Sequence, residues 1–257
     1  MTNFIPSDRQ QAILDMVAQN GFVSTEAMVA EFKVTPQTIR RDLNELGREG
    51  QLTRFHGGAG QAKSAVNLPY EDRRLSGLEA KRKIAELTSS LITNGSSLFL
   101  NIGTTAEAVA EALLDHKDLH VATNNMHVAT ILSKNESFRI MLAGGQVRHH
   151  DGAVVGLSAI SFVDSFRMDV GIVGISGIDE TGALLDFDAD EVRTAQSVMR
   201  NSQKVVLIAD HHKFGIRAMN RTGHLRDVDA LVTDAPLSEK YKTLCRESDT
   251  DVHVCED

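Results

Sequence analysis

The second part of the sequence alternates short apolar runs with stretches of helical periodicity, and this alternation restricts the fold more than any other feature. Helical patterns such as residues 106–114 and 192–199 separate the apolar runs. A parallel pair of strands needs a crossover connection, which a helix supplies. The sequence therefore predicts an α/β domain with a mostly parallel sheet. The expected strands are residues 98–100, 120–122, 140–142, 170–173, 205–209 and 230–232.

The first sixty residues carry the signals of three short helices followed by a hairpin. Ser7, Ser24 and Thr35 each stand where a side-chain oxygen can cap a helix, and Pro36 suits the first helical position. A strand pattern over residues 52–55 leads into a glycine-containing turn. Three helices and a hairpin are typical of a winged helix-turn-helix. The apolar residues expected inside are Ile13, Leu14, Val17, Ala27, Met28, Phe32, Ile39, Leu43 and Leu46.

Two changes of pattern divide the chain. Residues 60–76 lack periodicity, and a helical stretch over 78–92 then opens the α/β pattern. We therefore predict a winged helix-turn-helix domain over residues 1–60, a linker over 61–77 and an α/β domain over 78–257.

The polar side of the third helix suggests that it binds DNA. Once the apolar stripe of this helix is buried, arginine, amide and hydroxyl side chains remain, and these types bind base edges and phosphates. From Lys33 to Lys63 the sequence has six basic and three acidic residues. A helix face that is merely solvated is the alternative interpretation. The candidate DNA contacts are Thr35, Gln37, Thr38, Arg40, Arg41, Asn44, Arg54 and His56.

Small and polar residues follow the expected strands. Ligands of open α/β sheets bind outside the carboxyl ends of the strands, so these loops should meet in one crevice. Gly103-Thr104-Thr105 leads a strand into a helix and offers N–H groups to an anion, with ordinary turn chemistry as the alternative. Asp169, Asp179 and Glu191 are expected near this edge, as solvated carboxylates or as acceptors for ligand hydroxyls. The candidate effector contacts are Gly103, Thr104, Thr105, Thr123, Asn124, Asn125, Gly144, Gly145, Gly177, Asp179, Glu191 and Lys213.

Residues 35–43 and the His-Gly-Gly-Ala segment at 56–59 closely resemble the DNA-binding signature of the DeoR family of bacterial transcriptional regulators. The resemblance covers the rest of the chain, where residues 103–105 match the family's phosphate loop. It implies an effector-binding domain similar in fold to ribose-5-phosphate isomerase. It also implies a phosphorylated effector, with sn-glycerol 3-phosphate as the leading candidate.

The sequence departs from the family pattern at two places. Asn101 stands where the family often has Asp, and Ala195-Gln196 stand where a basic pair is common. The first change replaces a group that only accepts hydrogen bonds with a neutral amide. The second removes cations that could have faced a phosphate or another subunit. Both changes bear on the identity of the effector more than on its class.

These observations predict a repressor of a carbon-metabolism regulon that leaves its operator when a phosphorylated metabolite binds. The expected partners are double-stranded operator DNA, the effector and further copies of the chain in a dimer or tetramer, with no metal or cofactor. We expect no catalytic residue. The alternatives are a sugar-phosphate isomerase-like enzyme with Asp179 or Glu191 as general base, a regulator of another sugar phosphate, and a ligand-independent DNA binder.

The location of the charges qualifies the prediction of DNA binding. The net charge of −8 taken alone argues against nucleic acid. Residues 1–83, however, carry 12 basic and 10 acidic side chains, whereas residues 84–257 carry 15 and 25. The N-terminus lacks the pattern of a secretory signal, and no uncharged apolar run reaches the ~18 residues of a membrane helix. We therefore expect a cytoplasmic protein without a membrane partner, with Cys245 and Cys255 as free thiols.

Overall fold

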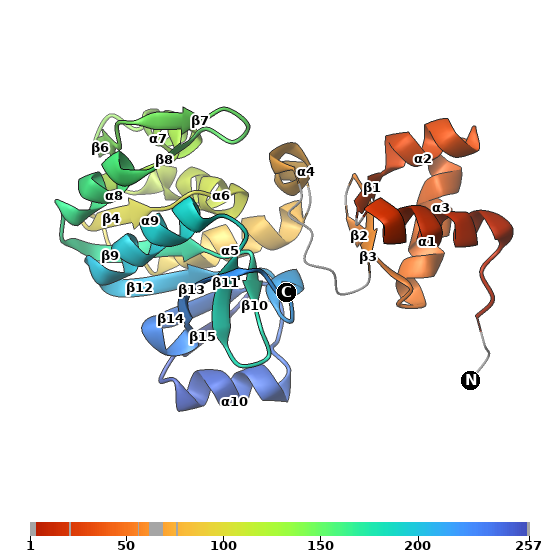
Figure 1. The fold of residues 1–257 in the computed structure, drawn as a ribbon. Coiled ribbons are helices and arrows are strands. Elements are labelled where there is room, and N and C mark those ends of the chain that lie inside the picture. The colour runs from red at the N-terminus through yellow and green to blue at the C-terminus, as the bar shows by residue number, and fades with distance from the viewer. Residues whose placement is uncertain (1–3, 21, 56, 62–68, 76, 256–257) are drawn as a thin grey trace. The chain divides into compact units, whose positions relative to one another are not determined.

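The structure, a computed structural model, describes residues 4–20, 22–55, 57–61, 69–75 and 77–255 (Figure 1). Contacts divide the chain into an N-terminal unit, Met1–Gly77, and a C-terminal unit, Leu78–Asp257. No helix of the described part is long and apolar enough to cross a membrane.

The N-terminal unit combines short helices with a three-stranded antiparallel sheet. The strand order is β1-β3-β2, so the first strand pairs with the returning strand of the hairpin. This first strand was not predicted, and Gly58 lies in a strand where a turn was expected. The elements are α1 (Asp8–Asn20), β1 (Phe22–Ser24), α2 (Thr25–Phe32), α3 (Pro36–Arg48), β2 (Leu52–Phe55), β3 (Gly58–Gln61) and α4 (Tyr70–Leu75).

The predicted caps explain where these helices begin. The backbone N–H of Ser7 donates to Gln10 Oε1 at 2.8 Å, and Ser7 Oγ accepts from the Gln10 N–H at 3.3 Å. Ser24 caps α2, and Thr35 caps α3 by accepting from the Thr38 N–H, with proline next in the chain. Each cap satisfies N–H groups that have no partner inside the helix.

The core of the N-terminal unit lies between the helices and the sheet. The stripe Ile39, Leu43 and Leu46 is buried, as predicted. The expectation for Ala27 is wrong, because the side chain of Met28 takes the core position and Ala27 is exposed. The core residues are Ile13, Val17, Val23, Met28, Ile39, Leu43, Leu46, Leu52 and Ala59, with Leu14 and Phe32 partly buried against them.

The C-terminal unit contains a seven-stranded sheet in which all neighbouring strands are parallel. The strand order is β15-β14-β12-β9-β4-β5-β6. This confirms the predicted α/β architecture, and the last strand adds an edge that was not predicted. The strands are β4 (Ser97–Leu100), β5 (His120–Thr123), β6 (Arg139–Leu142), β9 (Met168–Gly174), β12 (Ser202–Ile208), β14 (Ala230–Thr233) and β15 (Asp251–Val254).

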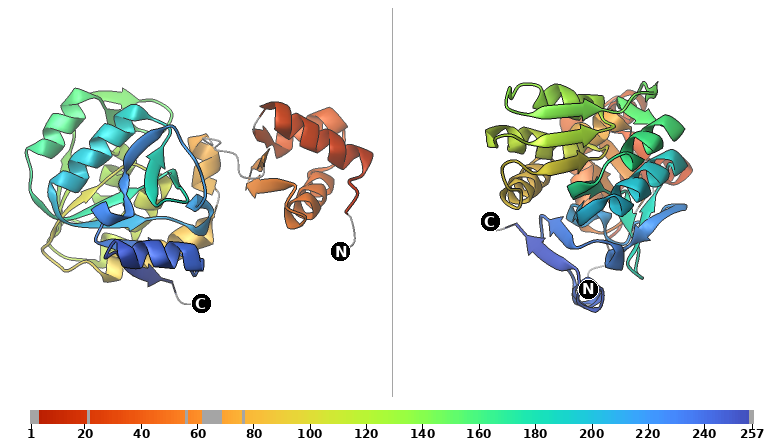
Figure 2. Two further views of the ribbon diagram at one scale, coloured as in Figure 1. Left: turned by 60° about the horizontal axis from the view of Figure 1, so that its bottom comes forward. Right: turned by 90° about the vertical axis from the view of Figure 1, so that its left-hand side faces the viewer.

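Helices cover both faces of this sheet (Figure 2). Alternate side chains of a strand point to opposite faces, so Leu98 and Leu100 pack on one side and Phe99 on the other. The first core includes α5 (Leu78–Ser90), α6 (Thr104–Ala112) and α7 (Met126–Leu132). The second includes α8 (Leu157–Asp164), α9 (Ala189–Arg200) and α10 (Glu239–Glu247).

Short strands outside the main sheet were not predicted. One hairpin pairs β7 (Gln146–Arg148) with β8 (Ala153–Val155). A second, antiparallel sheet has the order β10-β11-β13. Segments this short carry too few residues to show a periodicity. The strands of the second sheet are β10 (Gly177–Ile178), β11 (Ala183–Asp186) and β13 (Asn220–His224), and short 3-10 turns lie at Leu113–Asp115, His211–Lys213 and Leu225–Asp227.

Two glycines of β9 provide a matched test of the packing between sheet and helix. A Cβ on Gly171 would lie 2.9 Å from Val198 Cγ1 and would also clash with Ser202, whereas a Cβ on Gly174 would meet nothing closer than the Ile102 carbonyl oxygen at 3.8 Å. We expect Gly171→Ala to lower the free energy of unfolding by about 1–3 kcal/mol, as overpacking does, and Gly174→Ala to change it far less. Urea unfolding of both variants measures this, and equal effects would contradict the packing described.

Candidate functional site

The exposed face of α3 presents cationic and amide side chains. Gln37, Arg40 and Arg41 are exposed and make no hydrogen bond or ion pair with another side chain in the described part of the chain. Two acidic residues of the same helix are bonded to α1 instead. Asp42 accepts from Arg9 Nε at 2.6 Å, and Glu45 accepts from the Gln10 amide at 2.9 Å. The exposed arginines are therefore not paired with the carboxylates of their own helix.

Other candidate DNA contacts already have partners in the structure. The hydroxyls of Thr35 and Thr38 lie 2.9 Å apart at the start of α3, where Thr35 also caps the helix. The Arg54 guanidinium, from β2, donates to Asn44 Oδ1 of α3. This bond brings the hairpin next to the helix. His56 lies outside the described residues.

The strand order of the C-terminal unit defines where a ligand crevice should lie. From β4 the chain continues to β5 and β6 on one side, then crosses to β9 on the other side of β4 and proceeds outward to β15. The direction in which the strand order proceeds therefore reverses between β4 and β9, and the carboxyl ends of these two strands form the topological switch point of the sheet. Open α/β sheets bind ligands at such a point, because the loops leave in opposite directions there.

The segment after β4 opens into the N-terminus of α6. Gly103 is the N-cap with a φ of 134°, and no side chain caps this helix. Only glycine adopts that backbone conformation readily. The first N–H groups of α6, which begins at Thr104, and the hydroxyls of Thr104 and Thr105 are therefore present at the switch point. Together with the helix dipole, they can bind an anion.

The segment after β5 is buried and largely occupied by internal bonds. Thr123 Oγ1 donates to the Leu100 carbonyl at 2.7 Å, and Asn125 Oδ1 caps α7. The Asn124 amide donates to the Val154 carbonyl at 3.1 Å. Two amide oxygens, Asn101 Oδ1 and Asn124 Oδ1, are buried without a hydrogen-bond partner in the described structure. They follow neighbouring, register-matched strands, since Leu100 pairs with Thr123.

The remaining glycine and lysine candidates lie on several elements. Gly144 and Gly145 connect β6 with β7, and Gly145 approaches the side chain of Ser158. Gly177 is buried in β10, where a Cβ would lie 2.6 Å from the Ile216 carbonyl oxygen. Lys213 ends the 3-10 turn after β12 and is half-buried.

Asp169 lies elsewhere than the sequence suggested, and Asp179 is held within a turn. Asp169 is near the start of β9 and accepts from the Ser97 N–H at 2.8 Å, so it lies at the amino ends of the strands, and the expectation that it shares the crevice edge is wrong. Asp179 accepts from the N–H groups of Thr181 and Ala183 in the turn after β10. Burial alone raises the pKa of Asp179, but these bonds outweigh it and lower that pKa.

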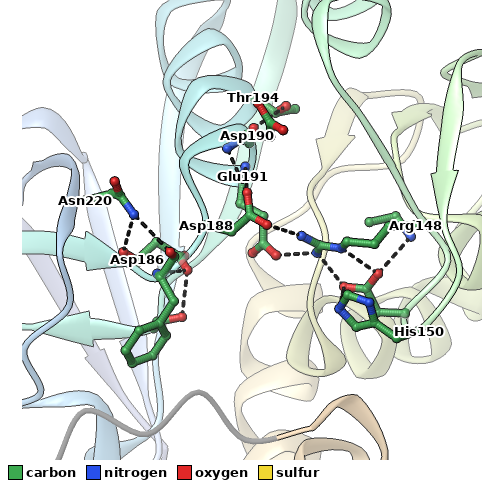
Figure 3. Close-up of polar contacts among 12 residues, drawn as sticks. Arg148, His150, Asp186, Asp188, Asp190, Glu191, Thr194 and Asn220 are labelled. Atoms are coloured by element: carbon green, nitrogen blue, oxygen red, sulfur yellow. Dashed lines mark hydrogen bonds and ion pairs between the residues drawn. The ribbon is translucent and has the colours of Figure 1, made fainter.

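Glu191 lies in an ionic cluster around Arg148, a residue that the sequence analysis missed (Figure 3). The guanidinium donates from Nη1 to Asp188 Oδ2 at 2.7 Å, from Nη2 to Asp151 Oδ2 at 2.5 Å, and from Nη2 to Glu191 Oε1. Its Nε also donates to Asp151 Oδ1 at 3.0 Å. Only 14% of the Arg148 side chain is exposed. The excess of acidic residues around position 190 was the available signal for a nearby cation.

The two departures from the family pattern differ in position. Asn101 supplies one of the unpartnered oxygens. Ala195 is buried in the C-terminal unit. Gln196 donates to the Arg221 carbonyl at 3.2 Å. No group of three or more His, Cys, Asp or Glu side chains that could hold a metal occurs among the described residues.

Both units match family models. Residues 9–65 match the DeoR-like helix-turn-helix domain, and residues 76–235 match the DeoR C terminal sensor domain. The chain is 50% identical over 230 residues to the glycerol-3-phosphate regulon repressor of Escherichia coli (strain K12), covering 90% of this chain and 91% of that one. It is 45% identical to the Haemophilus influenzae protein of the same name, covering 96% of both chains. The HTH-type transcriptional repressor CsqR of Escherichia coli is 36% identical, covering 98% of this chain and 97% of that one.

Solved structures with a similar fold are distant in sequence. Ribose 5-phosphate isomerase A from Methanocaldococcus jannaschii is 16% identical, covers 54% of this chain and 55% of its own, and superposes with a TM-score of 0.40. The translation initiation factor eIF-2B of Pyrococcus horikoshii OT3 is 14% identical and gives a TM-score of 0.46, and the match covers 86% of this chain and 81% of that one.

The cluster around Arg148 predicts a pH dependence of stability. Burial alone raises the pKa of Asp151, but the Arg148 guanidinium outweighs it and lowers that pKa below 3.8. As the pH falls, Asp151 therefore takes up its proton in the unfolded chain before it does so in the folded chain. The contribution of Asp151 to the free energy of unfolding is present above about pH 4 and is lost as the pH falls below it. We expect Asp151→Asn to be less stable than wild type at pH 6 and to approach it at pH 3 in urea unfolding. The exposed Asp251→Asn is the control, and a difference for Asp151→Asn that is constant with pH would contradict the pairing.

Proposed function

Because the chain belongs to the DeoR family of transcriptional regulators, we propose that it is a repressor of a glycerol 3-phosphate regulon. The N-terminal unit binds operator DNA, and the C-terminal unit binds sn-glycerol 3-phosphate, which releases the operator. The observation that supports this proposal best is the uncapped N-terminus of α6 at the switch point of a sensor domain whose relatives carry that metabolite in their name.

The reading of DNA is assigned to α3. Gln37 and Arg41 are one helical turn apart on the exposed face, and Arg40 lies beside them. Glutamine can bond to adenine, and arginine can pair with guanine or phosphate in the major groove. Asn44 and Arg54 extend this surface to the hairpin. A two-fold operator needs two such helices, so the proposal includes a homo-oligomer, a dimer or tetramer.

The effector is assigned to the crevice between the carboxyl ends of β4 and β9. The N–H groups at Gly103 to Thr105 would hold the phosphate. The unpartnered oxygens of Asn101 and Asn124 would accept hydrogen bonds from hydroxyl groups of the same ligand. Phosphate and hydroxyl groups are the functional groups of sn-glycerol 3-phosphate. The remaining candidates, Thr123, Asn125, Gly144, Gly145, Gly177, Asp179, Glu191 and Lys213, would shape or line the same site.

Release of the operator requires that the effector bind the DNA-free state more tightly than the DNA-bound state. The direct experiment is a gel-shift titration on operator DNA selected by the protein itself from random sequence. We expect sn-glycerol 3-phosphate to release the DNA at a lower concentration than ribose 5-phosphate or inorganic phosphate does. Release by another sugar phosphate alone would reassign the effector, and release by none would reject the effector site.

The enzyme alternative is disfavoured by the partners of its candidate bases. Glu191 is ion-paired with Arg148, and Asp179 is held by its turn with a lowered pKa, so both carboxylates are already bonded to groups of the protein. The relatives are also named as repressors. Consumption of ribose 5-phosphate or sn-glycerol 3-phosphate by the purified protein would restore the enzyme interpretation.

Arg41→Ala tests the DNA-reading surface. We expect operator binding to weaken by about 1–3 kcal/mol if Arg41 contacts a base, and the salt dependence to fall by about one counterion if it contacts a phosphate. Gel shifts at several salt concentrations measure both quantities. Arg200→Ala, an exposed arginine of α9, is the control. Operator affinity equal to that of wild type at every salt concentration would show that α3 does not bind as proposed.

Thr104→Leu tests the effector site. A bulky apolar side chain at the start of α6 removes a hydroxyl and obstructs the anion. We therefore expect unchanged operator binding without effector and at least a tenfold higher sn-glycerol 3-phosphate concentration for release, within the usual range of allosteric coupling. Thr243→Leu on the exposed side of α10 is the control. Normal release of the Thr104→Leu protein would place the phosphate elsewhere.

A further inference from the structure

The β7–β8 hairpin spans the sheet edge on which the effector crevice lies. At one side it is joined to the segment after β5. The Val154 N–H donates to the Asn124 carbonyl at 2.7 Å, the Asn124 amide donates to the Val154 carbonyl, and the Met126 N–H donates to the Gly152 carbonyl at 3.1 Å. These bonds fix β8 beside the carboxyl end of β5.

At the other side the hairpin reaches the N-terminus of α9, and Arg148 makes this connection. The beginning of α9 lies beside the carboxyl end of β9, because Ser176 Oγ, after β9, donates to Asp186 Oδ1 at 2.8 Å just before the helix. Strand β4 lies between β5 and β9 in the sheet. The hairpin therefore extends from one side of β4 to the other, at the end where Gly103 to Thr105 follow.

The chemistry of the connection is specific to arginine. Asp151 accepts from both Nε and Nη2 along one edge of the guanidinium and fixes it within the hairpin, while Nη1 reaches Asp188, the N-cap of α9, and Nη2 reaches Glu191 of α9. A planar fork can bind several carboxylates at once, whereas lysine offers a single point charge. Asp188 also caps α9 through its other oxygen, which accepts from the Asp190 N–H at 2.7 Å.

We propose that Arg148 is a positioning residue of the effector site. Its bonds hold the β7–β8 hairpin against the N-terminus of α9, across the carboxyl end of β4. The inference rests on the proposed function. The two walls of the crevice are the β7–β8 hairpin and the N-terminus of α9, and the guanidinium holds them together. It also offsets part of the charge of the three carboxylates, Asp151, Asp188 and Glu191. Without it, the walls separate and three carboxylates face an anionic ligand, so effector affinity falls while the DNA-reading unit is unchanged.

The experiment compares sn-glycerol 3-phosphate binding to the full-length protein by calorimetry at low and high salt. We expect Arg148→Gln to bind at least about tenfold more weakly than wild type at low salt, with a smaller difference at high salt, because salt screens the repulsion between carboxylates and phosphate. Arg148→Lys should fall between the two, since it keeps the charge and loses the fork. Cooperative urea unfolding shows that the C-terminal unit of each variant folds, and unchanged operator affinity shows that the N-terminal unit is intact. Arg139→Gln, an exposed arginine on β6, is the charge-matched control.

A second substitution distinguishes a positioning role from a general loss of structure. Asparagine caps helices about as well as aspartate, so Asp188→Asn keeps the cap of α9 and removes one carboxylate. We expect the double variant Arg148→Gln/Asp188→Asn to bind the effector more tightly than Arg148→Gln alone. Hydrogen exchange of residues 146–155 should also be faster in Arg148→Gln than in wild type.

The outcomes separate this inference from the proposed function. Failure of the wild-type protein to bind sn-glycerol 3-phosphate would reject the proposed effector and the inference with it. Binding by wild type and equally by Arg148→Gln would overturn the inference alone. The inference would also be overturned if the loss of effector affinity in Arg148→Gln were the same at every salt concentration and were not relieved by Asp188→Asn. Such a loss would indicate general disruption of the C-terminal unit and not a positioning role of Arg148.

Discussion

The parallel direction of the seven main strands is the constraint on which the rest of the C-terminal unit depends. Because every strand points the same way, every connection that leaves a carboxyl end starts at one edge of the sheet. The direction of the strand order reverses at β4, so the connections after β4 and β9 leave this edge in opposite directions. The N-terminus of α6 lies at this point, and it has no side-chain cap because its N-cap residue is Gly103. The proposed anion-binding groups, the unpartnered amide oxygens and the bonds from Arg148 to α9 all lie along this edge for the same topological reason.

In the N-terminal unit, burial determines which side chains can read DNA. Ile39, Leu43 and Leu46 lie on the core side of α3, and the bonds from α1 hold Asp42 and Glu45 away from the exposed arginines. An ion pair between Arg41 and a carboxylate of its own helix would compete with a base or phosphate. If α3 binds DNA as proposed, the packing of α1 contributes to that binding without touching the DNA.

The parts of this structure that could be predicted from sequence are those set by local chemistry. The caps at Ser7, Ser24 and Thr35 mark helix starts, and apolar runs mark the buried strands. The contacts of Arg148 with α9 and the position of Asp169 could not be predicted, because each depends on contacts between residues about 40 or more positions apart in the chain. The β7–β8 hairpin pairs residues that are close in the chain, but its strands are too short to be recognised from the sequence. A three-residue strand shows no periodicity, and no local signal indicates that Arg148 meets Glu191.

The distribution of charge links the two proposed binding activities. Residues 84–257 carry 15 basic and 25 acidic side chains, so the overall field of the C-terminal unit repels both DNA and a phosphorylated effector. On the proposed function, DNA would bind only where the basic face of α3 outweighs that field, which would limit non-specific binding. In the proposed site, a small anion would be held by short-range groups, namely the N–H groups at the start of α6, while Asp151, Asp188 and Glu191 are paired with Arg148. In the proposed site, Arg148 would assist these groups indirectly, because it offsets the charge of three carboxylates beside the anion.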